Sequence, residues 1–484
     1  MNFNEYTFGF ADANTEFLRI ENYFDNVFYD PQDNLNNIID GWPFIVVGRK
    51  GVGKSAYCAK IRSLQNEHFF TSYLPLNEFE YSTFEKTSTD KNVTGTQKFI
   101  HSWNFLLLSL IFKSLKNEMN ITESEPLDNV VSTLEKLGFS IDFNYKQFVT
   151  TLSKIKTGVN LKVFDVSYER EFGNKPDNYL NRISTINDYM MNNLKDIYLG
   201  DSKLLLLIDG VDDVLRFKKN RTEILNSLVR SIDYLNNSFT KNKINIKIVI
   251  FIREEIFSLL NDTDMNKIKR DSSIKIDWYN NTDALKQIVK LRMIFSGISP
   301  DKVENEFANL FPKNIKNKPV WDYLLEFTLY KPRDIIQFFK CCQELYGIKN
   351  KLSYSEVKET IKFYSNQYFI EEMKNGLSGF VNDELISVIP SVLTKISTNS
   401  FTLEDFMLKI NQQLPSKELD KSDIKLLLFT LYETGFIGQL IITGKGKYSK
   451  KSVQFKYRNP YSTLDYNNTF IVHRGITVGL GIKI

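Results

Sequence analysis

A glycine-rich stretch, FIVVGRKGVGKSAYCAKI at residues 44–61, contains the residue types that can bind phosphate. Gly48 is followed after four residues by Gly53, Lys54 and Ser55, which is the full spacing of a Walker A motif. Glycines let the backbone curl so that successive N–H groups face one anion, and the lysine reaches the terminal phosphates. The expected nucleotide-binding residues are Gly48, Gly51, Val52, Gly53, Lys54, Ser55 and Ala56.

The second motif is LLLLIDGVDD, in which a run of consecutive apolar residues ends at the acidic residue Asp209. A carboxylate at the end of a buried strand can hold Mg²⁺ together with the hydroxyl of Ser55, so both are predicted metal ligands. Gly210 stands where many ATPases have a catalytic glutamate. The carboxylates return at Asp212 and Asp213, which could orient the attacking water or have a structural role.

A guanine-reading motif is suggested by NKPD at residues 174–177, but its position argues against it. In GTPases this motif follows the Mg²⁺-binding aspartate, whereas here it precedes Asp209, and Asp209 does not begin an Asp-x-x-Gly. The predicted ligands are therefore ATP and Mg²⁺.

The elements that must position these residues alternate between strands and helices. Apolar runs at 203–209 and 244–253 suit strands buried on both faces of a parallel sheet, and helical periodicity follows each Walker motif. This alternation predicts an α/β P-loop NTPase core with a parallel sheet. The expected parts are an N-terminal segment (1–40), the core (41–116 and 196–268), a helical insertion (117–195), a helical lid (269–375) and a winged-helix domain (376–484).

Composition excludes several other classes of protein. The three cysteines give no disulfide framework, and the three histidines lie far apart in the sequence, which argues against zinc-hydrolase chemistry. The net charge of +4 argues against nucleic-acid binding over the whole surface. The N-terminus has no signal-peptide pattern, and no apolar run approaches the roughly 20 residues of a membrane span. We therefore expect a soluble, cytoplasmic protein with no membrane partner.

The order of these motifs resembles the STAND and NACHT-like branch of P-loop ATPases. The resemblance rests on the Walker A motif, IDGVDD, a strand ending in IFIREEIF, and then WYNNTDALKQIVKLR and YKPRDIIQFF. The chain also resembles KAP-type ATPases, which are often encoded in antiphage defence operons. No repeat array or effector domain is recognisable, and this departs from typical STAND proteins. The resemblance implies an ATPase whose effector chemistry lies in another polypeptide.

The resemblance implies roles for two arginines. Arg253 would lie at the sensor position beside the γ-phosphate, and Arg333 would reach the nucleotide from the helical lid as a second sensor. An arginine that binds oxygens present only before hydrolysis couples the nucleotide state to the position of the lid. The alternative for Arg333 is a packing role at the start of a helix, against a neighbouring acid.

The C-terminal part reads as helix, helix, glycine turn, strand, basic loop and strand, which is the order of a winged helix. Its hairpin would be GKGKYSKKSVQFKYR, residues 444–458. This segment could lie along duplex DNA, or its lysines could keep an exposed hairpin soluble. The basic residues of the segment are Lys445, Lys447, Lys450, Lys451, Lys456 and Arg458, and Tyr448 could rest on a sugar or base.

These observations predict an ATP-binding molecular switch that hydrolyses slowly, with a separate effector protein as partner. It could act in antiphage defence and could form a homo-oligomer. The main alternative is a DNA-remodelling or DNA-loading ATPase that uses its winged helix on duplex DNA. A third possibility is a nucleotide-bound scaffold that never hydrolyses ATP.

Overall fold

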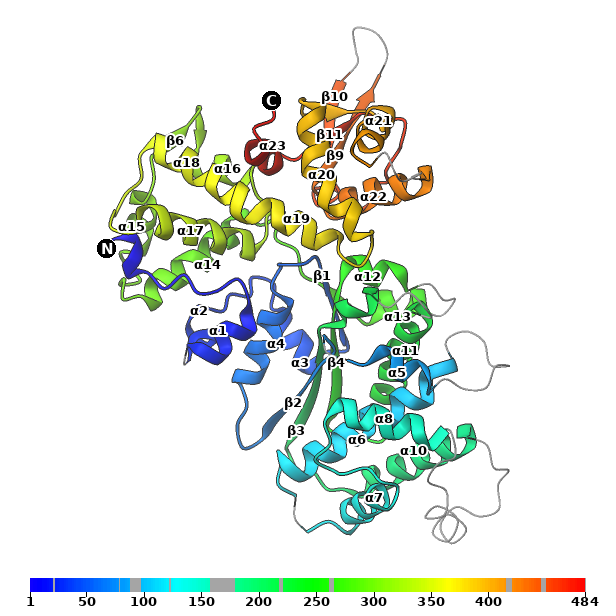
Figure 1. Cartoon of the computed structure of the whole chain (residues 1–484). Helices are drawn as coiled ribbons and strands as arrows, with labels where there is room; N and C mark the ends of the chain where they lie inside the picture. Colours follow the sequence, from blue (N-terminus) through cyan, green and yellow to red (C-terminus); the bar gives the residue numbers. More distant parts are fainter. Residues whose placement is uncertain are drawn as a thin grey trace. The chain divides into compact units, whose positions relative to one another are not determined.

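The computed structural model describes residues 1–20, 22–77, 79–87, 97–121, 123–156, 179–216, 221–260, 265–414, 420–444 and 450–483 (Figure 1). Contacts divide the chain into two compact units. Unit 1 consists of Met1–Pro31, Gly48–Ala59 and Ile276–Ile484, and unit 2 consists of Gln32–Val47 and Lys60–Lys275. The five parts predicted from the sequence form a finer division, which stays a prediction.

A parallel sheet forms the centre of unit 2, and the predicted α/β fold is confirmed. Its strands among the described residues have the order β2-β3-β4-β1-β5. Strand β3 lies between β2 and β4, pairs with β2 from Lys203 to Asp209, and has six of its seven residues buried. Such a strand needs apolar residues at consecutive positions because both of its faces are covered. The strands are β1 (Ile45–Gly48), β2 (Phe69–Pro75), β3 (Lys203–Asp209), β4 (Ile246–Arg253) and β5 (Ser273–Lys275).

Helices accompany this sheet, and the longest of them form an apolar layer. Trp103 of α6 is fully buried, and its indole N–H donates a hydrogen bond to the carbonyl of Ile224 in α11 at 3.1 Å. The predicted insertion is helical where it is described, and its helices α7 and α10 contact α6. The helices are α3 (Asn34–Asp40), α4 (Lys54–Ser63), α5 (Tyr81–Glu85), α6 (Gln97–Asn117), α7 (Glu125–Lys136), α8 (Tyr145–Lys156), α10 (Tyr179–Asp196), the 3₁₀ turn η2 (Val211–Arg216), α11 (Arg221–Lys241), α12 (Glu254–Leu259) and α13 (Met265–Asp271).

The helical lid of unit 1 packs together with the N-terminal segment. Arg292 of α14 forms a buried ion pair with Glu16 at 3.4 Å and donates a hydrogen bond to the carbonyl of Phe8 at 3.1 Å. The elements of this region are η1 (Phe3–Glu5), α1 (Ala13–Arg19), α2 (Tyr23–Val27), α14 (Thr282–Phe295), α15 (Val303–Asn309), β6 (Asn314–Ile315), β7 (Lys318–Pro319), α16 (Val320–Leu325), α17 (Pro332–Tyr346), α18 (Tyr354–Tyr364), the π-helical turn η3 (Ser365–Phe369) and α19 (Ile370–Leu377).

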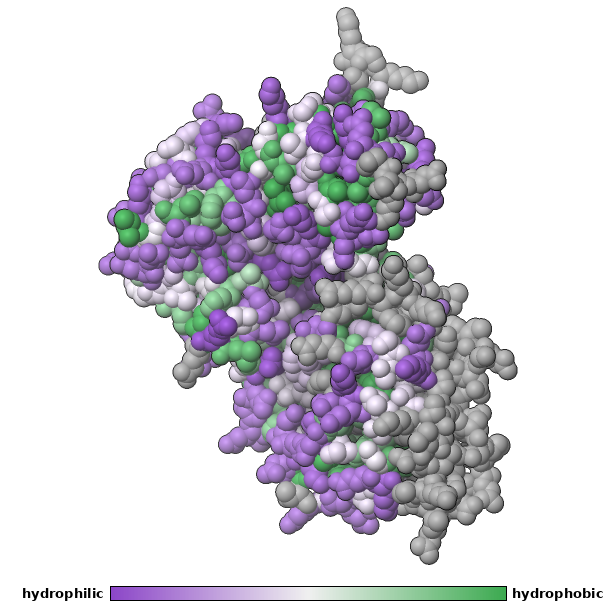
Figure 2. Space-filling model, viewed as in Figure 1, coloured by the Kyte–Doolittle hydropathy of each residue, from purple (hydrophilic) through white to green (hydrophobic). Residues whose placement is uncertain are grey.

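The C-terminal part of unit 1 has the element order of a winged helix, as the sequence predicts. Its antiparallel sheet has the strand order β10-β9-β11-β8. Leu426 and Phe429 are exposed on one face of α22, and Figure 2 shows apolar patches among polar ones on this domain. The elements are α20 (Asp383–Ile396), β8 (Ser400–Phe401), α21 (Leu403–Gln413), α22 (Lys421–Glu433), β9 (Ile437–Thr443), β10 (Lys450–Gln454), β11 (Phe470–Val472) and α23 (Arg474–Leu480).

Within the described ranges, none of the helices combines the length and the hydropathy needed to cross a bilayer.

Candidate nucleotide-binding site

The loop between β1 and α4 has the backbone of a phosphate cradle. Gly51 and Gly53 have φ angles of +86° and +103°, a region that residues with a Cβ rarely adopt. A Cβ on Gly48 would lie 2.5 Å from the side chain of Val52, so this position has no room for a side chain. The glycines of the motif are therefore required by the shape of the loop.

Lys54 and Ser55 open helix α4 directly after this loop. The Lys54 ammonium donates hydrogen bonds to the carbonyls of Gly48 at 2.9 Å and Arg49 at 3.2 Å, so its side chain lies back over the loop. The first N–H groups of a helix have no carbonyl partner within that helix, and they carry its positive dipole end. Both lysine and helix terminus thus present positive charge at the loop, as an anion site requires.

Contacts within unit 1 fix the cradle at two further points. The indole N–H of Trp278 donates a hydrogen bond to the carbonyl of Val52 at 2.9 Å, and both residues are buried. Arg49 is 5% exposed, donates to the carbonyl of Leu329 at 3.2 Å and lies 3.5 Å from Asp277. Sequence reasoning assigned no role to Trp278 or Asp277; a large indole three residues after the short strand β5 is the signal that could have identified them.

The start of α17 packs against the same loop. The backbone N–H of Arg333 donates to the carbonyl of Gly51 at 3.3 Å, and a Cβ on Gly51 would lie 3.3 Å from the Cβ of Arg333. The Arg333 side chain donates to the carbonyl of Ala11 at 3.0 Å and lies 3.6 Å from the carboxylate of Glu372. Glu372 also lies 3.9 Å from Lys50 of the loop. Sequence reasoning missed this buried glutamate.

A buried aspartate anchors the turn that carries Arg333. Asp334 accepts a hydrogen bond from the N–H of Leu329 at 2.7 Å and another from the hydroxyl of Tyr368 at 3.2 Å. Burial raises the pKa of Asp334 above its usual range, and the nearby positive charge of Lys331 opposes that shift. Tyr368 comes from the π-helical turn, an irregularity often found at functional sites. The lid residues that touch the P-loop are thus held by a buried polar network.

Other predicted site residues lie in unit 2, at the carboxyl end of β3. Asp209 is 8% exposed, and its carboxylate accepts a hydrogen bond from the N–H of Gly210 at 2.8 Å. Gly210 has a φ of +79°, and a Cβ there would lie 2.9 Å from the backbone nitrogen of Asn77. A glutamate at position 210 would therefore be strained in this turn.

Two predicted catalytic residues contact each other in unit 2. Arg253 ends β4, and its guanidinium lies 2.6 Å from the carboxylate of Asp212 in the 3₁₀ turn after β3. The Arg253 side chain is 11% exposed and that of Asp212 is 38% exposed, so solvent reaches the pair from the side of the aspartate. The side chain of Asp213 lies outside the described residues. Water positioning by Asp212 or Asp213 and a sensor role for Arg253 remain predictions.

These residues suit ATP and Mg²⁺. The cradle of Gly48–Ser55 has the donors that phosphates need, whereas the assignment of Ser55 and Asp209 as Mg²⁺ ligands stays a prediction. In the described part of the chain, no group of three or more His, Cys, Asp or Glu side chains is placed to hold a metal ion. A Walker-type site does not need one, because it takes few ligands from the protein.

The structure divides the basic residues of segment 444–458 into different environments. Lys450 and Lys451 are exposed on β10. Lys456 lies 3.3 Å from Glu433 and donates to the carbonyl of Ser462 at 2.9 Å. Arg458 lies over the rings of Phe455 and Tyr457. Lys445, Lys447 and Tyr448 lie outside the described residues.

Comparisons with known proteins give one family and several solved structures. Residues 283–371 match FunZ_C, the FunZ-associated C-terminal helical domain. No curated protein matches the sequence. The structure is similar, at a TM-score of 0.39 and 9% identity, to the Aeropyrum pernix ORC1 protein in complex with DNA, covering 96% of this chain and 94% of that one. It is also similar to the Aeropyrum pernix ORC2 protein in ADPNP–ADP complexes (TM-score 0.39, 11% identity, covering 96% and 98%) and to Cdc6p from Pyrobaculum aerophilum (TM-score 0.30, 12% identity, covering 96% and 99%).

Proposed function

We propose that this chain is an ATP-binding molecular switch that hydrolyses ATP slowly with Mg²⁺. The observation that carries the proposal is the P-loop itself, in which Gly51 and Gly53 have positive φ angles and Lys54 opens a helix. A loop of this shape binds a polyphosphate through backbone N–H groups and one ammonium group.

Contacts of the P-loop with the lid support the switch. The loop bonds to the lid through the carbonyls of Gly51 and Val52 and the guanidinium of Arg49. Phosphate binding would draw the Lys54 ammonium away from the loop carbonyls that it now contacts, and the loop would adjust. Because the lid bonds to the same loop, its position would depend on the nucleotide. Arg333 and Arg253 would bind oxygens of the γ-phosphate and so distinguish ATP from ADP.

Calorimetry with ATP and Mg²⁺ tests the proposal. Lys54→Ala should weaken ATP binding at least tenfold, because it removes a charge-assisted contact worth about 1.5 to 3 kcal/mol. Lys60→Ala is a matched control further along α4 and should leave the affinity unchanged. Equal affinity in wild type and Lys54→Ala would overturn the proposal. Tight binding without phosphate release would instead identify the non-hydrolysing scaffold.

Duplex DNA binding by the winged helix is a second candidate, favoured by the exposed Lys450 and Lys451 on β10. Replacing both with Gln should flatten the dependence of DNA affinity on salt by about 0.9 in logarithmic slope for each phosphate that the protein no longer neutralises. Lys456→Gln is the control, since its ammonium already pairs with Glu433. No affinity of the wild type at low salt would remove the DNA-loading alternative.

The use of the switch in antiphage defence, with a separate effector protein, is supported by the resemblance of the motifs. Co-purification with the products of neighbouring genes, in the presence and absence of ATP, would test that partnership. A stable complex that depends on ATP would support an effector, and a homo-oligomer alone would argue for self-assembly.

A further inference from the structure

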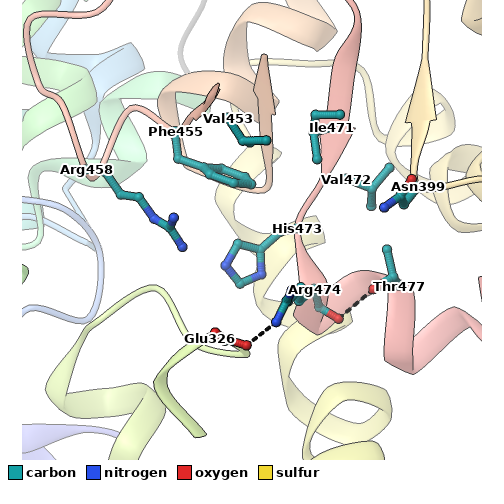
Figure 3. A pocket seen from close by; sticks show the side chains of 10 residues that line it. All are labelled: Glu326, Asn399, Val453, Phe455, Arg458, Ile471, Val472, His473, Arg474 and Thr477. Carbon is teal, nitrogen blue, oxygen red and sulfur yellow. Dashed lines mark hydrogen bonds and ion pairs between the residues drawn. The ribbon is translucent and has the colours of Figure 1, made fainter. Parts of the chain in front are cut away.

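A pocket away from the P-loop lies where β10, β11 and the start of α23 meet the residues before α17 (Figure 3). Its volume is about 280 Å³, close to the lower end of small-molecule sites. One part of its lining is apolar and the rest carries two arginines. The lining residues are Glu326, Asn399, Val453, Phe455, Arg458, Ile471, Val472, His473, Arg474 and Thr477.

The positive charge of the pocket comes from Arg458 and Arg474. Arg474 pairs with Glu326, and the other carboxylate oxygen of Glu326 pairs with Lys318, so this acid already has two basic partners. Arg458 forms no ion pair with any described residue and lies over the Phe455 and Tyr457 rings, 5.2 and 5.4 Å from their centroids. Figure 3 shows its guanidinium directed toward His473. The three cations and one acid leave a local excess of positive charge.

His473 adds no charge but fixes the geometry. Burial lowers the pKa of His473 to about 3, so the ring is neutral at ordinary pH. Its Nδ1 accepts a hydrogen bond from the N–H of Gly475 at 3.1 Å, which leaves the proton on Nε2, 3.2 Å from the hydroxyl of Tyr457. Tyr457 in turn lies beneath Arg458. The arginine is therefore supported by an ordered aromatic platform.

The remaining walls suit the planar or apolar part of a ligand. Val453, Phe455, Ile471 and Val472 supply apolar side chains. The side-chain amide of Asn399 forms no hydrogen bond with the described residues and is available to a polar edge of a ligand. Guanidinium groups match phosphate oxygens through paired N–H donors. A ligand that combines an anionic group with a ring would contact both the arginines and the apolar side chains of this lining.

We propose that this pocket binds a small phosphorylated ring compound of mononucleotide size, with the phosphate at Arg458 and Arg474 and the ring against Val453 and Phe455. Such a ligand could be a free mononucleotide or the phosphorylated end of a nucleic-acid strand, which share this chemistry. None of the residues that line this site belongs to the P-loop.

Thymidine 5′-monophosphate is a suitable probe, titrated into the Lys54→Ala chain by calorimetry so that the P-loop does not contribute. One molecule should bind per chain, and thymidine or inorganic phosphate should each bind at least about tenfold more weakly. No binding of the monophosphate at about 1 mM, or equal binding of inorganic phosphate, would overturn the proposal. A 5′-phosphorylated thymidine oligonucleotide that binds more tightly than the monophosphate, and than its unphosphorylated form, identifies the strand end as the source.

Substitutions locate the binding. Arg458→Gln should weaken binding of the monophosphate about tenfold or more, while Lys395→Gln removes one exposed charge at the end of α20 in the same domain and should change the affinity less than about twofold. Equal losses in the two variants would mean diffuse attraction and would overturn the site. Val453→Trp fills the pocket from a position that is 42% exposed and should abolish binding without lowering thermal stability. Undiminished binding in that variant would place the ligand elsewhere.

Discussion

The contact between Arg333 and Glu372 gives a prediction whose size can be worked out from the structure. Glu372 has a side chain that is 8% exposed, with Arg333 at 3.6 Å and Lys50 at 3.9 Å. Breaking a fully buried ion pair costs about 3 to 5 kcal/mol. Here the separation is long, Arg333 is 25% exposed, and Lys50 remains. We therefore expect Arg333→Ala to lower the free energy of unfolding by about 1 to 2 kcal/mol.

A double-mutant cycle measured by thermal unfolding checks this value. Arg333→Ala should lower the melting temperature by about 2 to 8 °C, taking about 2 to 4 °C per kcal/mol for a large domain. Glu372→Gln should cost little more once Arg333 is gone, giving a coupling of about 1 kcal/mol. The control cycle uses Lys374 and Glu371, an exposed pair on the same helix, where the coupling should be at most about 0.5 kcal/mol.

Additive losses in the Arg333–Glu372 cycle would refute the reasoning, because residues that do not interact show no coupling. Repeating the cycle with ATP and Mg²⁺ separates the two roles considered for Arg333. If Arg333 senses the nucleotide, the Arg333→Ala substitution should also reduce the stabilisation of the fold by ATP. It should reduce the ATP-dependent protection of the lid from hydrogen exchange as well. A purely packing role would leave both unchanged.

Three further changes have defined outcomes. Trp278→Phe removes the donor to the buried Val52 carbonyl. It should lower the free energy of unfolding by about 1 to 3 kcal/mol and weaken ATP binding in calorimetry. An unchanged unfolding free energy and an unchanged ATP affinity would show that this hydrogen bond does not shape the loop. Asp212→Asn should spare ATP binding and slow phosphate release, whereas Asp209→Ala should weaken Mg²⁺-dependent binding; normal turnover in Asp212→Asn would make Asp212 structural. The pKa of His473 is lowered to about 3, so the unfolded chain binds a proton there that the folded chain does not, and stability should fall as the pH falls from about 6.5 to 3. His473→Asn, which can still accept the hydrogen bond from Gly475, should flatten that acid-side loss in denaturant titrations, and an identical pH profile would contradict the assignment.

The parts of the site that depend on local sequence were predictable. The strand before Gly48, the helix from Lys54 and the buried strand ending at Asp209 all follow from short patterns of apolar residues and glycine, and the structure has them at β1, α4 and β3. These elements follow from backbone geometry and burial, which act over a few residues.

The surroundings of the loop were not predictable in the same way. Trp278, Leu329 and Glu372 approach the P-loop from positions more than 200 residues later, and no local pattern marks such contacts. The sequence also did not show which charges of segment 444–458 are unpaired, because Lys456 pairs with Glu433 only in the folded domain. Predicted lysines on a hairpin are free for ligands only where folding leaves them exposed.

The bond from Trp278 to Val52 and the stacking of Arg49 on Tyr457 also set an order of events during synthesis. Every described strand of the parallel sheet has been made once residue 275 is complete, but the residues that contact the P-loop from the lid and from the winged-helix domain are made later, up to Tyr457. At about 5 to 20 residues per second, the ribosome needs about 20 to 80 s to pass from the P-loop to Tyr457. In a nascent chain the strands of the sheet are therefore complete well before all the contacts of the nucleotide cradle. We expect tight ATP binding only in chains whose synthesis has passed Tyr457.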